Sequence, residues 1–271
     1  MSLAPDSPPP SAPPVRPPPS TRFGWGKFAA LLVWTLLLAA GYALYLGVIS
    51  LPEHLRPYNP WEPLDVRAQP NLLTPFKLAR ARSNPALCQS ALAQTGMEYE
   101  ALPDRVTGPG CGFDNAVRIR SAPIRLGGPL TLSCPMALSF VMWERHALQP
   151  AALAHFGEPV AAIEHFGSYA CRNINSGGGA AAHAPAWQRS RHATADALDV
   201  SALVLRSGKR ISVLQDFRRP DTQESITPEA EWLNDVQAGA CQYFKGVLGP
   251  NYNAVHRDHF HFETGGYGMC R

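Results

Sequence analysis

"HRDHFHFE", residues 256–263, ends in an alternation of polar and aromatic side chains. Alternation of this kind predicts a β-strand, because successive side chains along a strand point to opposite faces of a sheet. The two phenylalanines would pack on the core, while His259, His261 and Glu263 would share the opposite face. We therefore predict a half-buried strand that presents imidazoles away from the core.

"SRHATADALDV", residues 190–200, is the other stretch with residue types that bind metals. Six residues separate His192 from Asp199, so a histidine on a loop and an aspartate at the start of a strand could converge on one ion. Zinc commonly binds imidazole nitrogen and carboxylate oxygen, and a catalytic zinc keeps a fourth position for water. With His261, which lies well within the predicted strand, these residues would form a His₂Asp zinc site.

The segments around these stretches predict an α+β domain with a small antiparallel sheet flanked by helices. Short strands are expected within 110–128, and two apolar runs joined by Ser207-Gly208 predict a hairpin. The expected elements are helices over 86–96, 134–148 (closed by Pro150) and 230–249, strands within 110–128 and at 259–263, and the hairpin over 197–217.

Three segments of distinct composition precede this domain, which we place at residues 85–271. Residues 1–27 are rich in proline and predict a disordered, cytoplasmic tail. Residues 28–50 form an apolar run long enough to cross a hydrocarbon core of about 30 Å as one transmembrane helix. Residues 51–84 again carry many prolines and predict a semi-extended stalk.

The charges around the apolar run predict its orientation. Arg16, Arg22 and Lys27 precede the run, whereas Glu53 and His54 follow it. By the positive-inside rule the N-terminus stays in the cytoplasm, and the C-terminal domain is exported across the inner (cytoplasmic) membrane to the periplasm. A net charge of +3, without a run of lysines and arginines, gives no support for a nucleic-acid partner.

All six cysteines follow the apolar run, and an even number in an exported domain favours disulfides. The chain has no C-x-x-C pair, so a zinc-thiolate site has little support. By closeness along the chain, the preferred pairs are Cys88–Cys111, Cys134–Cys171 and Cys241–Cys270.

"S-x-H-x-x-A-x-A-x-D" followed later by "H-x-D-H-x-H" resembles the LAS-type zinc peptidases, which include the D-Ala-D-Ala carboxypeptidases and the penicillin-insensitive murein endopeptidase. Residues 85–271 more closely resemble the bacterial extensin-like C-terminal domain family. That resemblance rests on "GCGFDNAV", "SCPMALSFVMW", "SYACRNIN", "SRHATADALDV" and "VLGPNYNAVHRDHFHFE". It implies a LAS or peptidase M15-like fold.

The resemblance also implies zinc as the cofactor, with His192, Asp199 and His261 as its ligands. It implies that Arg172, in "YACRNIN", stabilises negative charge on the attacked carbonyl. The Gly177–Gly179 run nearby predicts a mobile loop at the mouth of the site.

Three residues compete for the role of general base. The resemblance to carboxypeptidases places it three residues before the last ligand, at Asp258, which is our first choice. His259 and His256 are the rivals, as in the murein endopeptidase type. The expected protein is a membrane-anchored, zinc-dependent peptidoglycan hydrolase that cuts peptide bonds; the alternative is a non-catalytic wall-binding module with the same fold.

Overall fold

The computed structural model describes residues 25–174, 189–219, 226–266 and 268–271. The chain divides into two units, residues 1–50 and residues 51–271. Most of the predicted proline-rich tail lies outside the described residues, as does the predicted loop at Gly177–Gly179.

The first unit contributes one helix, α1 (Trp25–Tyr45). Its most apolar window has a mean hydropathy of 1.9, and none of this window is buried, so its length and composition allow it to cross a membrane. The hydroxyl of Thr35 donates a hydrogen bond to the carbonyl of Leu31 at 2.8 Å, which satisfies this polar group within the helix. The helix shares residues 28–45 with the segment that the sequence predicts to span a membrane, but it starts three residues earlier and ends before residue 50.

The predicted stalk is wrong, because residues 51–84 fold with the domain. They form the short helix η1 (Glu53–Tyr58) and helix α2 (Thr74–Arg82). The apolar side chains of this segment join the main core, namely Leu64, Val66, Leu78 and Ala81.

The prolines of this segment mark turns and a helix start rather than an extended chain. Pro75 lies in the first turn of α2, where a missing backbone N–H costs no intrahelical hydrogen bond. The guanidinium of Arg80 donates to the carbonyls of Pro60 and Trp61, each at 2.7 Å, and so ties the loop to α2. Proline content alone therefore gave a misleading prediction here.

The main sheet has six strands and is antiparallel except for one edge pair. Its order is β11-β9-β10-β7-β6, and β8 pairs with β7. The strands are β6 (Val160–Gly167), β7 (Ala197–Leu205), β8 (Arg210–Ser212), β9 (Gly246–Leu248), β10 (Phe260–Glu263) and β11 (Met269–Cys270).

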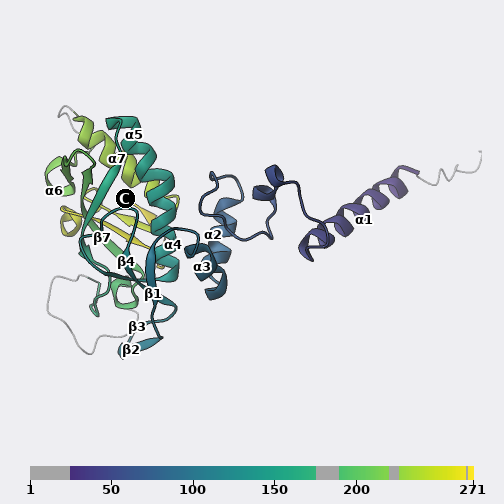
Figure 1. Ribbon diagram of the computed structural model, residues 1–271, viewed down its shortest axis with the longest axis horizontal. Helices are drawn as coiled ribbons and strands as arrows, with labels where there is room; N and C mark the ends of the chain where they lie inside the picture. The colour runs from purple at the N-terminus through teal and green to yellow at the C-terminus, as the bar shows by residue number, and fades with distance from the viewer. Residues whose placement is uncertain (1–24, 175–188, 220–225, 267) are drawn as a thin grey trace, which may run out of the picture. The chain divides into compact units, whose positions relative to one another are not determined.

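Two smaller sheets accompany it. They contain β1 (Glu98–Ala101), β4 (Ala116–Ser121) and β5 (Leu130–Ser133) in the order β1-β4-β5, and the pair β2 (Arg105–Gly108) and β3 (Cys111–Phe113). The helices that flank the sheets include α4, α5 and α7 (Figure 1). Their bounds are α3 (Pro85–Leu92), α4 (Cys134–Trp143), α5 (Gln149–Phe156), α6 (Val213–Asp216) and α7 (Pro228–Ala240).

The fold is thus α+β, as predicted, but two predicted helix ends are wrong. Helix α4 continues through a π-helical turn, η2 (Glu144–Leu148), into α5, and Pro150 lies in the first turn of α5 instead of stopping the helix. At the other end of the chain, α7 stops at Ala240, and residues 246–248 form β9. Pairing of β9 with β10 outweighs the local helical pattern there.

The core lies between the main sheet and the helices. The ring of Trp143 contacts that of Phe262 at a centroid distance of 5.0 Å, and Phe244 stacks on Phe262 at 4.7 Å. Phe217 packs on Phe260 at 5.8 Å. Both phenylalanines of β10 are fully buried, as the alternation in HFHFE predicts.

Three disulfides link the six cysteines, and the predicted pairing holds only for the last. The pairs are Cys88–Cys134, Cys111–Cys171 and Cys241–Cys270. Cys88 lies on α3 and Cys134 begins α4, so the packing of these helices, rather than closeness along the chain, selects the partner.

Candidate metal centre

Strands β7 and β10 place an aspartate opposite a histidine. In their antiparallel register Asp199 pairs directly with His261, and Phe262 pairs with Leu198 on the core side. Alternation therefore carries Asp199 and His261 to the face away from the aromatic core. Both side chains are nevertheless buried, with exposed fractions of 7% each.

A short helix brings His192 to the same place. η4 (Arg191–Thr194) starts at Ser190, whose hydroxyl accepts a hydrogen bond from the backbone N–H of His192. It ends at Ala195, which has φ = 58° and turns the chain into β7. Asp196 fastens this turn, because its carboxylate accepts hydrogen bonds from Ser133 and Thr194 at 2.6 Å each.

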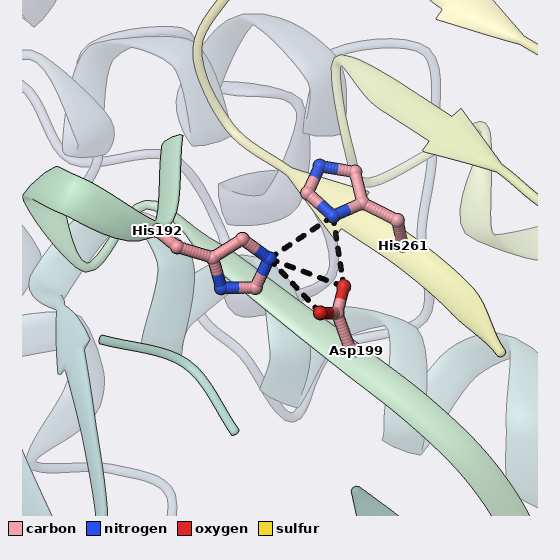
Figure 2. Close-up of side chains that lie close together, drawn as sticks. All are labelled: His192, Asp199 and His261. Atoms are coloured by element: carbon pink, nitrogen blue, oxygen red, sulfur yellow. Dashed lines mark hydrogen bonds and ion pairs between the residues drawn. The ribbon is translucent and has the colours of Figure 1, made fainter. Parts of the chain in front are cut away.

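The three side chains converge on one point (Figure 2). Nε2 of His192 lies 3.1 Å from Oδ1 of Asp199 and 3.2 Å from Nδ1 of His261. Nδ1 of His261 lies 2.8 Å from the same carboxylate oxygen. Three potential ligand atoms from a helix and two strands thus face each other in a buried position.

The outer nitrogen of each imidazole already has a hydrogen-bond acceptor. Nδ1 of His192 donates to the carbonyl of Ser168 at 2.6 Å, and Nε2 of His261 donates to Glu263 at 3.1 Å. In the neutral tautomers, the nitrogens that face Asp199 therefore carry lone pairs. Two lone pairs and a carboxylate in contact require a shared proton or a cation between them.

The electrostatics of the site agree with this requirement. Although burial opposes charge on Asp199, its hydrogen bonds with His192 and His261 hold the pKa of this carboxyl well below its usual range. Burial alone would lower the pKa of His261, but hydrogen bonds with Asp199 and Glu263 outweigh it and raise that pKa to about 9. The carboxylate of Asp199 therefore stays charged and pairs with a cation, which is either a proton held on an imidazole or a metal ion.

The donor set and its spacing fit zinc. Tetrahedral zinc lies about 2.0–2.2 Å from nitrogen and oxygen ligands, so neighbouring ligand atoms are about 3.3–3.6 Å apart. The two separations that involve Nε2 of His192 are 3.1 and 3.2 Å, close to that value. The third separation, between Nδ1 of His261 and Oδ1 of Asp199, is 2.8 Å, so these two atoms would move apart by about half an ångström to share a zinc ion. The second partners, Ser168 and Glu263, orient the imidazoles in the way that ligand histidines require.

Two of the predicted catalytic residues lie beside Asp199. Nη2 of Arg172 lies 3.5 Å from its Oδ2, and Nε2 of His259 lies 3.6 Å from its Oδ1. Nδ1 of His259 in turn donates to Asp258 at 2.8 Å. Among the described contacts, Asp258 reaches the cluster only through His259, so the geometry ranks the imidazole ahead of our first choice for the base.

His256 forms the edge of the histidine group. Its ring lies 5.2 Å from that of His259 and 5.8 Å from that of His261, between ring centroids. Nδ1 donates to Asn253 at 2.8 Å. Burial and the electrostatic influence of the neighbouring imidazoles lower the pKa of His256 to about 4, so it is neutral at neutral pH.

Glu263 is the functional residue that our sequence analysis left without a role. It accepts from His261, and its side chain packs against the α-carbon of Gly246, where a Cβ would come within 2.4 Å of it. The sequence could have indicated this role, because strand alternation puts Glu263 on the same face as His261.

Aromatic rings border the cluster. The ring of Phe166, on β6, packs edge-on against His259 at 5.7 Å, and Tyr252 packs against His256 at 5.5 Å. Phe166 remains 62% exposed and Tyr252 41% exposed. Such exposed rings beside buried polar groups offer an apolar contact surface for a ligand.

A comparison with protein families matches one family model, described as "Extensin-like protein C-terminus", to residues 86–271. The match covers well over half of the chain and includes every residue of the candidate metal centre. Neither the curated proteins nor the solved structures give a match to the chain.

Proposed function

The chain belongs to the family of proteins with an extensin-like C-terminus, and we propose that it is an exported zinc hydrolase that cleaves peptide bonds in peptidoglycan. The proposal rests first on one observation. His192, Asp199 and His261 direct three acceptor atoms at one buried point, while Ser168 and Glu263 occupy the outer nitrogens of both histidines. Such an arrangement suits three protein ligands of a catalytic zinc.

When bound, zinc supplies Lewis acidity, which polarises a carbonyl group and acidifies water. His259 is the best placed of the neighbouring residues to take a proton, because its Nε2 faces Asp199 while Nδ1–H is held by Asp258. Asp258 would fix the tautomer of His259 and stabilise the imidazolium that results. His256, neutral and adjacent, would be the second candidate for the base.

Arg172 would stabilise the negative charge that develops on the attacked carbonyl. Its guanidinium lies 3.5 Å from Asp199 and is partly exposed, with 37% of its side chain accessible, so it is open to a substrate. A fixed cation in this position contributes most when charge appears in the transition state.

A peptide is the substrate class that these surroundings suit best. Phe166 and Tyr252 offer exposed rings next to the histidines, and Arg172 offers a cation for a carbonyl or carboxylate oxygen. Peptidoglycan is the peptide polymer that an exported bacterial hydrolase would meet, and the resemblance of the two motifs to LAS-type peptidases supports this choice.

The proposed location is the inner membrane. Helix α1 would anchor the chain, with the N-terminus in the cytoplasm and the disulfide-bonded domain in the periplasm. The anchor would hold the hydrolase near the membrane side of the wall.

Incubation of the purified full-length protein with muropeptides, before and after removal of zinc by a chelator, tests the proposal. We expect new peptide products that disappear with the metal and return when zinc is added. Retention on wall sacculi without new products, under every metal condition, would contradict the hydrolase and favour a wall-binding module.

A further inference from the structure

A cavity separate from the metal centre lies in the segment that the sequence predicted to be a stalk. Its volume is about 280 Å³, and all of its lining residues fall within residues 53–77. This volume lies just below the range of about 300–1,000 Å³ that is common for small-molecule pockets, so the cavity suits a small group such as a lipid headgroup. It is lined by cationic, acidic and amide side chains as well as by prolines.

Lys77 is the most unusual residue of this lining. Its side chain is only 6% exposed, yet its ammonium group makes no hydrogen bond or ion pair with the described residues. Its neighbours Leu78 and Ala81 are packed in the core, which fixes the helix that carries it. Burial lowers the pKa of Lys77, while Glu62 and Asp65 partly offset this effect. A largely buried lysine whose ammonium group has no direct partner favours an anionic ligand.

Two further features of the lining add positive potential to the cavity. Thr74 and Lys77 belong to the first turn of α2, whose N-terminus attracts negative charge and has no side-chain cap at Leu73. Arg56 contributes a second cationic side chain to the lining. An anionic group would therefore find two cations and a helix N-terminus together.

Acidic residues also line the cavity, so it carries negative as well as positive charge. Glu53 and Glu62 also line it, and neither carboxylate has a hydrogen-bond partner among the described residues. The carboxylate of Asp65 is in part occupied, because Oδ1 accepts from the backbone N–H of Arg67 at 2.8 Å. A lining that holds both cations and carboxylates without hydrogen-bond partners suits a zwitterion better than a simple anion.

We propose that this cavity binds a phosphoethanolamine group, with the phosphate against Lys77 and Arg56 and the primary ammonium against Glu53 and Glu62. Such a group occurs in a soluble phosphodiester and in the headgroup of a phospholipid. We favour the phospholipid as the source, because only residues 46–52 separate the end of α1 from the segment that forms the cavity.

Calorimetric titration of the full-length protein in detergent with glycerophosphoethanolamine tests the proposal. We expect saturable binding that Lys77→Met weakens by about tenfold or more, the loss expected for one charge-assisted hydrogen bond. Lys245→Met, at an exposed lysine elsewhere on the domain, is the matched control and should bind as the wild type does. Equal affinity in wild type and Lys77→Met would overturn the proposal.

A second variant tests the cavity without removing the charge. Ala68 lines the cavity, so Ala68→Trp should fill it and abolish binding while Lys77 remains. Unchanged thermal unfolding and zinc content would show that both variants fold. Glu62→Gln should weaken glycerophosphoethanolamine but not glycerol 3-phosphate; equal affinity of the wild type for these two ligands would refute the zwitterionic assignment.

Nanodiscs distinguish the two sources of the ligand. The full-length protein is placed in phosphatidylcholine discs with or without phosphatidylethanolamine, and the soluble probe is titrated into each. Loss of probe binding in discs with phosphatidylethanolamine would identify the lipid headgroup as the occupant. Equal probe binding in both discs would identify a soluble ligand.

Discussion

Nε2 of His192 lies 3.2 Å from Nδ1 of His261, although 69 positions separate the two residues in the sequence. Each of these imidazoles uses its other nitrogen as a hydrogen-bond donor, to Ser168 and to Glu263. The protein therefore orients two lone pairs toward one carboxylate, that of Asp199. The predictions below follow from this arrangement and from the residues around it.

Glu263→Gln should weaken zinc binding by about 10–100-fold, the range typical of residues that orient a metal ligand. The amide still fills the space beside Gly246 but no longer supplies a negative charge to His261. Competition with a fluorescent zinc chelator measures the affinity, and Glu231→Gln on the exposed face of α7 is the matched control. A zinc affinity equal to that of the wild type would show that Glu263 does not orient the ligand.

His259→Ala should lower kcat/KM by about 10²–10⁴, the scale of general-base catalysis, with zinc retained. Asp258→Asn should cost less, about 10–100-fold, because it removes only the group that orients His259. Steady-state kinetics on a defined muropeptide, with zinc content measured in parallel, ranks the two residues. A larger loss in Asp258→Asn than in His259→Ala would instead make the carboxylate the base.

Phe166→Ala should raise KM by about 5–10-fold, because one partly exposed aromatic contact contributes about 1 kcal/mol to binding. Zinc content and kcat should stay close to the wild-type values, since the ring lies outside the three-residue cluster. Leu153→Ala removes a similarly exposed apolar side chain from α5 and should change neither constant. A fall in kcat at unchanged KM would show that the ring supports His259 rather than the substrate.

The disulfide between Cys88 and Cys134 should stabilise the domain by about 3–4 kcal/mol, from the entropy of closing a loop of this length in the unfolded chain. We expect the double variant Cys88→Ala, Cys134→Ala to lose this amount in the free energy of unfolding, measured with urea. Peptide mapping without reduction should link the peptides of these two cysteines. A peptide that links Cys88 to Cys111 would support the pairing by closeness along the chain instead.

The parts of the fold that the sequence predicted are those that depend on local periodicity. Alternation in HFHFE placed Phe260 and Phe262 in the core and His261 opposite them, because a strand has a fixed period of two residues. The hairpin of β7 and β8 followed from the turn at Ser207-Gly208 in the same way.

Other features depend on contacts between distant residues and could not be predicted in this way. The packing of Leu64 and Leu78 into the core is invisible in the composition of a proline-rich segment. The pairing of Cys88 with Cys134 depends on how α3 meets α4. Likewise, the sequence could not predict that His259 lies between Asp258 and Asp199. That arrangement depends on where the side chains point just before β10, which the spacing of the residues leaves open.

The most direct test of the central claim is the zinc content of the purified full-length protein and of three single variants, His192→Ala, Asp199→Ala and His261→Ala. Elemental analysis should find about one zinc per chain in the wild type and much less in each variant, because loss of one of three protein ligands removes most of the affinity. His155→Ala, whose imidazole bonds Asp235 on the surface, should keep its zinc. Equal zinc content in the wild type and all three ligand variants would contradict the assignment of this site.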